Sequence, residues 1–199
     1  SPTSLSVLAL LLATAPAPAP EAKNTAIKTA IPKLARIGKI QIGCSTQEDL
    51  AQHWGEGKAI IGGHPNSGRL WRVTGTPWLL QTDGFEYSKR GLVVDSLTVY
   101  GDPERFSGPE LLRAVPCARL AKSDFAWGGE IWPGMSEAKV RQILKRKAWP
   151  LTPAKDGCET SAKGFYALQN SMDPLRTWTA RLVFTNGWLS QLTLNAGFK

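Results

Sequence analysis

Two stretches of the chain share one strand–turn–strand pattern. DGFEYSKRGLVVDSLTVYG (residues 83–101) and ARLVFTNGWLSQLTLNAG (residues 180–197) each contain a Gly turn, and each closes on Leu-Thr-Val or Leu-Thr-Leu. A turn flanked by short β-branched and aromatic runs predicts a hairpin, and Asn186-Gly187 is the strongest such signal in the chain. We therefore expect two copies of one small module in tandem, with sheets that suit a binding surface.

A short helix is predicted ahead of each set of strands. Residues 43–57 (GCSTQEDLAQHWGEG) offer Ser45 or Thr46 as the N-cap, with acidic residues in the first turn. Residues 134–147 (GMSEAKVRQILKRK) repeat this arrangement with Ser136 as the cap. Each module is thus expected to order its elements as a helix followed by antiparallel strands.

The spacing of apolar residues predicts the strands and the residues that face the core. Residues 69–73, 77–82, 84–88 and 92–100 are predicted as strands of the first module, and a helix is expected within 109–122. The residues expected to face a core are Trp54, Val93, Leu97, Val99, Val140, Ile143, Leu144 and Trp178.

These elements predict an α+β protein of two tandem modules, each a short helix packed on a small antiparallel β-sheet. An apolar share of 42% is enough for a core, and a charged share of 20% argues against disorder. The expected divisions are a signal peptide with an Ala/Pro segment (1–22), a first module with a basic lead-in (23–101), a connector (102–128) and a second module (129–199). Two unrelated α+β halves with common turn chemistry are the alternative.

The N-terminal residues 1–22 differ from the rest of the chain. They hold an apolar run from Leu5 to Ala13 and then small residues alternating with Pro, with no basic residue before the run. This pattern predicts a secretory signal, and hence a periplasmic or secreted protein. A flexible Ala/Pro linker is the alternative. The run is too short to span a bilayer, and no later segment resembles a membrane helix.

The chain is strongly basic. Its net charge is +8, and all 24 Lys and Arg lie after residue 20. Such a charge favours an acidic partner, and we expect a protein with an acidic surface. Export argues against nucleic acid, and so does the scattering of the charges outside the run 145–147.

Tryptophan is the compositional anomaly, with eight in 199 residues. Trp and Arg are enriched at the energetic centres of protein interfaces. Arg69, Trp71, Arg72 and Trp78 lie close in sequence, and Tyr87 is expected on an adjoining strand, so this group is the predicted partner-binding site. In the alternative, Trp71 and Trp78 fill space beneath the Gly-rich loop.

The sequence predicts no catalytic residue, metal site or cofactor. Of three cysteines, Cys117 and Cys158 are the best disulfide candidates in an exported chain, although the sequence does not decide the pairing. The alternative function is a thiol-dependent hydrolase that uses Cys44 with His53 or His64, the two histidines present. No local signature supports this alternative.

The helix-plus-meander pattern resembles the β-lactamase-inhibitor-protein-like fold and the related small outer-membrane assembly lipoproteins of the SmpA/OmlA type. In the second module the resemblance rests on Gly134, Ser136, Val140, Phe184, Asn186 and Gly187. In the first module it rests, more loosely, on Gly43, Ser45, Leu50, Tyr87 and Gly91. It implies a non-enzymatic binding role, either as an inhibitor or immunity-type protein or as an envelope-assembly scaffold. The long connector and the segment GGHPNSGRLWRVTGTPW depart from the pattern.

Overall fold

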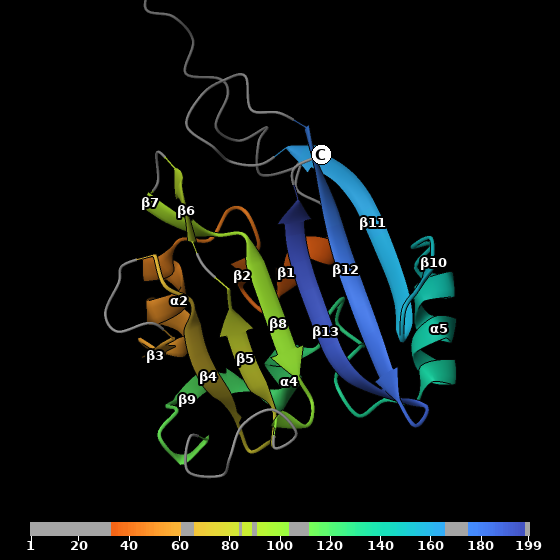
Figure 1. The fold of residues 1–199 in the computed structure, drawn as a ribbon, viewed down its shortest axis with the longest axis horizontal. Coiled ribbons are helices and arrows are strands. Elements are labelled where there is room, and N and C mark those ends of the chain that lie inside the picture. The colour runs from red at the N-terminus through yellow and green to blue at the C-terminus, as the bar shows by residue number, and fades with distance from the viewer. Residues whose placement is uncertain are drawn as a thin grey trace, which may run out of the picture.

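The computed structural model describes residues 33–60, 66–83, 85–88, 91–103, 112–165 and 175–197. It is an α+β structure in which antiparallel strands predominate (Figure 1). Its main sheet has the strand order β10-β11-β12-β13-β8-β5-β4-β3, with β9 beside β4. These strands are β3 (Lys58–Ala59), β4 (Arg69–Thr74), β5 (Leu79–Thr82), β8 (Ser96–Tyr100), β9 (Cys117–Ala121), β10 (Thr152–Ala154), β11 (Gly157–Phe165), β12 (Leu175–Thr185) and β13 (Trp188–Gly197).

The remaining elements are short helices and two small hairpins. The β1–β2 hairpin follows η1 directly, and the β6–β7 hairpin forms a separate two-stranded sheet. Their bounds are η1 (Lys33–Ala35), β1 (Arg36–Ile37), β2 (Ile40–Gln41), α2 (Gln47–Trp54), β6 (Phe85–Ser88), β7 (Gly91–Val94), α4 (Lys122–Phe125) and α5 (Glu137–Arg146).

The two repeated sequence segments meet at the middle of the main sheet. Strand β8 pairs antiparallel with β13, and this pairing sets the Leu-Thr-Val triad directly against Leu-Thr-Leu. Thr98 lies opposite Thr193, and the flanking apolar residues lie opposite one another. Strands from both halves of the chain therefore form one continuous sheet, whereas the sequence predicted a small sheet for each half.

The hairpin prediction holds for the second segment and needs correction for the first. Asn186 and Gly187 have φ of 52° and 79°, as a tight hairpin turn requires, and they join β12 to β13. In the first segment the expected single strand 92–100 breaks at Asp95, whose carbonyl accepts a hydrogen bond of 2.9 Å from Ala196 N. The residues before the break form β7, and those after it join the main sheet as β8.

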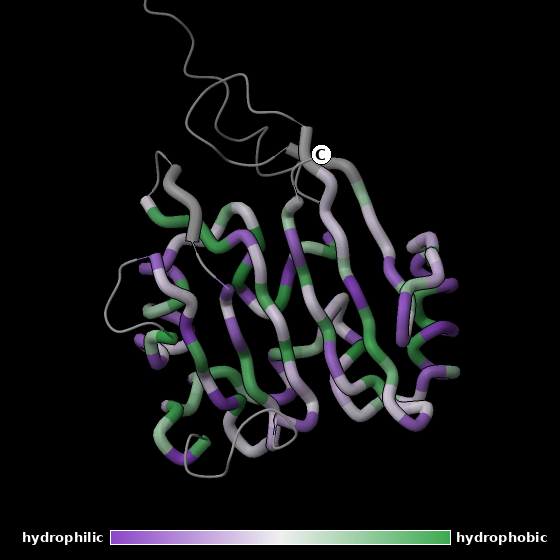
Figure 2. Tube along the Cα trace, in the orientation of Figure 1, coloured by the Kyte–Doolittle hydropathy of each residue, from purple (hydrophilic) through white to green (hydrophobic). Residues whose placement is uncertain are grey.

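One face of the main sheet carries the hydrophobic core. Apolar and polar residues alternate along the strands (Figure 2), so one set of side chains points into the core and the other away from it. Residues of the helices and of the β1–β2 hairpin belong to this core. In Figure 1 the β1–β2 hairpin lies behind the sheet, while α2 and α5 lie at its two margins. All the residues predicted as core are buried: Trp54, Val93, Leu97, Val99, Val140, Ile143, Leu144 and Trp178.

Both predicted helix starts are confirmed. Thr46 caps α2 by accepting a hydrogen bond of 3.1 Å from Asp49 N, and the Asp49 carboxylate accepts one of 2.8 Å from Thr46 N. This reciprocal pair is a capping box. The Ser136 hydroxyl accepts from Lys139 N in the same way at the start of α5. Gly55 ends α2, as expected.

The connector contains helical residues at 112 and 113, within the range 109–122 where a helix was expected, but it also contributes to the sheet. Residues 117–121 form β9, which pairs parallel with β4, and their side chains alternate between buried and exposed. Ala118 and Leu120 face the core. The alternation in Cys-Ala-Arg-Leu-Ala fits a strand better than a helix, since both buried residues share one parity.

The predicted disulfide is absent from the structure, in which none of the three cysteines is disulfide-bonded. Cys117 lies beside Arg72 of β4, and Cys158 lies opposite Leu182 of β12. Strands β4 and β11 are five steps apart in the sheet order, which is roughly 24 Å at the usual strand spacing. A disulfide needs Cα atoms within about 7 Å, so the fold keeps this pair apart.

Candidate functional site

The candidate site is the face of the main sheet that points away from the core, called here the open face. No described helix packs on it. One row of residues crosses six strands in register: Leu70, Gln81, Thr98, Thr193, Arg181 and Glu159. A second row, one pleat away, contains Arg72, Leu79, Tyr100 and Gln191. Half of these ten residues carry hydroxyl or amide groups, three are charged (Arg72, Arg181 and Glu159), and two are apolar, of which Leu79 is only 5% exposed.

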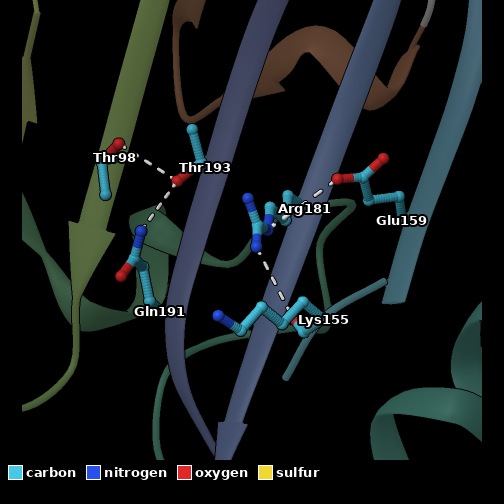
Figure 3. Close-up of polar contacts among 6 residues, drawn as sticks. All are labelled: Thr98, Lys155, Glu159, Arg181, Gln191 and Thr193. Atoms are coloured by element: carbon cyan, nitrogen blue, oxygen red, sulfur yellow. Dashed lines mark hydrogen bonds and ion pairs between the residues drawn. The ribbon is translucent and has the colours of Figure 1, made fainter. Parts of the chain in front are cut away.

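A chain of hydrogen bonds holds the centre of the open face (Figure 3). The Thr98 and Thr193 hydroxyls are 3.1 Å apart, and the Gln191 side-chain amide donates a bond of 3.2 Å to Thr193 Oγ1. Thr98 is only 3% exposed, whereas Thr193 and Gln191 on the neighbouring strand are half-buried and accessible. The centre of the face is thus pre-ordered, and a partner binding there would not have to fix these rotamers.

The β11–β12 side of the open face carries an ion pair. Arg181 Nε lies 3.8 Å from Glu159 Oε1, and Arg181 Nη2 donates a long bond of 3.4 Å to the Lys155 carbonyl (Figure 3). Both charged side chains are more than 40% exposed. An exposed pair of this length contributes little to stability. Arg181 is therefore available to a partner at little cost to the fold.

The Ser96 end of β8 carries a second polar group, and Tyr100 lies at the other end of this strand. Asp83 accepts hydrogen bonds from Gln81 Nε2 at 2.9 Å and from Ser96 Oγ at 2.8 Å. Burial raises the pKa of the Tyr100 hydroxyl above its ordinary value, and the negative charge of Asp83 raises it further. Tyr100 therefore stays a neutral phenol that can donate a hydrogen bond well into the alkaline range.

Trp188 is the residue at this site that sequence reasoning missed. Its side chain is 56% exposed, beside the β12–β13 turn, and strand alternation turns it away from the core that buries Leu189. An exposed Trp next to a polar face is the kind of residue that dominates protein interfaces. The signal was present in the sequence, because Trp188 directly follows the Asn186-Gly187 turn, where hairpin tips are solvent-exposed.

The predicted partner-binding group does not form one surface. Trp71 is 1% exposed and Trp78 is 5% exposed, so both are core residues. The Trp71 ring packs edge-on against Trp54 at 5.6 Å, and Trp78 packs against Phe125 at 5.2 Å. Both rings therefore fill interior space, as the alternative prediction had it, although residues 61–65 of the Gly-rich loop lie outside the described residues.

The other members of that group are divided between surfaces. Strand alternation places Arg69 on the side of Trp71, at the sheet margin, and Arg72 on the open face. Arg72 Nε donates a bond of 3.0 Å to the Val115 carbonyl, which ties it to the connector. Tyr87 belongs to β6, outside the main sheet, and its side chain lies outside the described residues.

The residues of the thiol-hydrolase alternative are only partly placed. Cys44 and His53 line one small cavity of about 250 Å³, together with Asp49. Cys44 precedes α2 and is 6% exposed, while His53 is in the last turn of that helix. At about 1.5 Å per residue, the helix rises roughly 10 Å from Thr46 to His53, so Cys44 and His53 lie near opposite ends of α2. His64 lies outside the described residues.

The described residues contain no group of three His, Cys, Asp or Glu side chains that could hold a metal ion. None of the helices described is both long enough and apolar enough to cross a membrane. Comparison with known protein families, with curated proteins and with solved structures finds no match. The resemblance to the inhibitor-like fold therefore stays a prediction from the sequence.

Proposed function

We propose that this protein is a non-enzymatic binding protein that covers a surface of another protein with the open face of its sheet. The observation that carries the proposal is the one-sided sheet. Residues of the helices and of the β1–β2 hairpin join the core on the apolar face, whereas the face with Thr98, Thr193 and Arg181 has no covering element among the described residues. The proposal includes the two-module architecture, with β8 and β13 as equivalent strands of the modules.

The size of the open face fits a protein partner. Strands β4, β5, β8, β13, β12 and β11 are four to eleven residues long. At about 4.8 Å between strands and 3.4 Å per residue, they cover on the order of 700 Å². A stable protein complex uses roughly 800 Å² on each partner. A small ligand would need a concave pocket instead, and this face is a sheet surface.

The chemistry of the face defines the partner. Its hydroxyl, amide and phenol groups match a polar protein surface, and Arg181 adds a positive charge at one side. The whole chain has a net charge of +8, so an acidic partner would be attracted over a longer range. Trp188 supplies an exposed aromatic group at the hairpin end. We infer a folded, acidic protein as the target, which this chain inhibits by occlusion.

The test is binding of wild-type and variant chains to one identified target. Proteins captured by the full chain from envelope and secreted-protein extracts would be purified, and their dissociation constants measured at two salt concentrations. We expect Arg181→Glu and Trp188→Ala each to weaken binding by at least about tenfold, since Arg and Trp side chains contribute much of the binding energy at protein interfaces. Lys145→Glu is the matched control, because it makes the same charge change on exposed helix α5.

The results of these measurements distinguish an inhibitor from a scaffold protein and test whether the open face is the binding site. Loss of binding in the two open-face variants alone supports the proposal, and loss of the target's activity on binding supports inhibition. A target whose activity is unchanged would favour the scaffold role instead. Equal affinity of all variants for the target would overturn the open face as the binding site. Export stays a prediction from residues 1–22, which lie outside the described residues.

A further inference from the structure

The covered side of the molecule contains a cavity that the proposed binding face does not use. It has a volume of about 670 Å³ and lies between the β1–β2 hairpin and the segment that follows α4. The hairpin residues Ile37 and Ile40 are fully buried, and η1 contacts β12 and β13, so this wall is fixed to the core. Pockets of 300–1,000 Å³ are the usual size for small organic ligands.

Positive charge gathers around this cavity, called here the basic cavity. Lys33, Arg36 and Lys147 line it, and the one carboxylate among the lining residues is Asp124. Within the described part of the chain, neither Lys33 nor Arg36 makes an ion pair. Lys147 Nζ lies 3.3 Å from Glu130 Oε1 at the margin. Three cations and one carboxylate thus line a common space, and Arg36 Nη2 also donates a long bond of 3.4 Å to Gln41 Oε1. The excess of positive charge favours an anion there.

One wall of the basic cavity is aromatic. The Trp149 ring packs at 4.9 Å against Trp127, and the Trp127 indole N–H is held by a hydrogen bond of 2.7 Å to the Leu34 carbonyl. Trp149 is half-buried, so part of its ring faces the cavity. This wall is rigid because its supporting ring is fully buried and hydrogen-bonded.

A glycine allows the Trp149 ring to lie close to the backbone. Gly128 has φ of +61°, and a Cβ at this position would lie 3.0 Å from Trp149 Cη2. A side chain there would press on the ring and alter the wall. The sequence Trp-Gly-Gly at 127–129 thus provides both the supporting indole and the space beside it.

We propose that the basic cavity binds a small aromatic anion, with its acidic group between Lys33 and Arg36 and its ring against Trp149. The cavity has the two components that such a ligand needs, cations on the hairpin side and an aromatic surface on the other. It lies on the opposite side of the sheet from the open face. Ligand and protein partner can therefore be bound at the same time, and the two proposals are tested separately.

The test uses three probes with the full chain and isothermal titration calorimetry. Naphthalene-1-sulfonate has the ring and the charge, naphthalene-1-sulfonamide has the ring without the charge, and inorganic sulfate has the charge without the ring. We expect saturable binding of one naphthalene-1-sulfonate per chain, binding at least about tenfold weaker for the sulfonamide, and no saturable binding of sulfate.

Variants locate the site. Arg36→Gln combined with Lys33→Gln is expected to weaken naphthalene-1-sulfonate binding by about tenfold or more, because charge-assisted hydrogen bonds are lost. Both side chains are exposed, so the fold should not change, and circular dichroism checks this. Arg181→Gln on the open face is the control for loss of a cation elsewhere, and each single variant, Arg36→Gln or Lys33→Gln, is compared with it at equal charge; the control should bind like the wild type. Equal binding of the sulfonamide, an equal loss in Arg181→Gln, or no binding at all would overturn the proposal.

Discussion

The indole Nε1 of Trp71 donates a hydrogen bond of 2.9 Å to the carbonyl oxygen of Gly55. This bond joins β4 of the sheet to the end of α2, and the same ring contacts Trp54 at an interplanar angle of 77°. Gly55 ends the helix in a backbone conformation with φ of 91°, which glycine adopts without strain. The helix end, its cap and the sheet are thus fastened at one buried residue.

Two substitutions of Trp71 should lower the free energy of unfolding by different amounts. Trp71→Phe keeps most of the apolar volume but leaves the Gly55 carbonyl without its partner, and we expect a loss of about 1–2 kcal/mol. Trp71→Ala also opens a cavity, with an expected loss of about 3–5 kcal/mol. Urea denaturation measures both. Trp188→Ala, at an exposed position, should change stability by less than about 0.5 kcal/mol.

Gly57→Ala should be destabilising because its new Cβ would collide with a neighbouring ring. A comparison with Gly75→Ala separates this collision from backbone strain. A Cβ at Gly57 would lie 2.5 Å from Trp71 Cε2, inside a buried ring. Gly75 has nearly the same φ, +71° against +68°, but nothing lies within 4 Å of its Cβ position. Gly75→Ala therefore measures backbone strain alone. We expect Gly57→Ala to cost about 1–3 kcal/mol more in thermal or urea unfolding. Equal losses would show that the ring moves aside freely.

The Thr98 and Thr193 hydroxyls should be energetically coupled. They are the facing pair of the central strands, and each can donate to or accept from the other. A double-mutant cycle with Thr98→Val and Thr193→Val should give a coupling of about 0.5–1 kcal/mol. Each single valine leaves one hydroxyl without this bond, whereas the double variant leaves none. Additive losses would mean that the bond is not formed in solution.

Stability should fall at alkaline pH through Tyr100. Burial and, secondarily, the charge of Asp83 raise the pKa of Tyr100 in the folded chain above the ordinary value of 10.0. The folded chain therefore holds this proton more tightly than the unfolded chain. The resulting stabilisation is complete below pH 10 and is lost as the pH rises through the folded-state value. Unfolding free energies at pH 8 and above pH 10 should differ less in Tyr100→Phe than in the wild type.

The three thiols should react at different rates. Cys117 is exposed on β9, whereas Cys158 is fully buried and Cys44 is 6% exposed. Burial raises the pKa of the Cys158 thiol, which lowers its thiolate fraction at neutral pH. Ellman's reagent should therefore modify one thiol per chain rapidly, and Cys117→Ser should abolish that fast phase. A fast phase that persists in Cys117→Ser would contradict the burial of the other two.

Local chemistry in the sequence predicted the helix ends and the second hairpin. Thr46 and Ser136 cap helices because their hydroxyls can satisfy backbone N–H groups three residues ahead, and this depends on nearby residues only. The break at Asp95 was not predictable in the same way. It depends on a hydrogen bond with Ala196, about one hundred residues later in the chain.

The candidate site, too, depends on tertiary contacts that local sequence patterns do not reveal. Eight tryptophans indicate aromatic surfaces, but strand alternation alone does not tell which side of the sheet the helices cover. Trp71 and Trp188 both lie in strands, and tertiary packing buries one and exposes the other. The basic cavity could not be predicted for a similar reason, because Arg36 and Trp149 line it together although they are far apart in the sequence.

The pairing of β8 with β13 has a consequence for assembly. It joins strands from the two halves of the chain in antiparallel register, and the segment between them runs through the connector. The same register can form between two molecules. In that case β13 of one copy pairs with β8 of a second copy, and β13 of the second copy pairs with β8 of the first. Refolding at high protein concentration should therefore yield a domain-swapped dimer alongside the monomer, with each sheet complete but built from two chains.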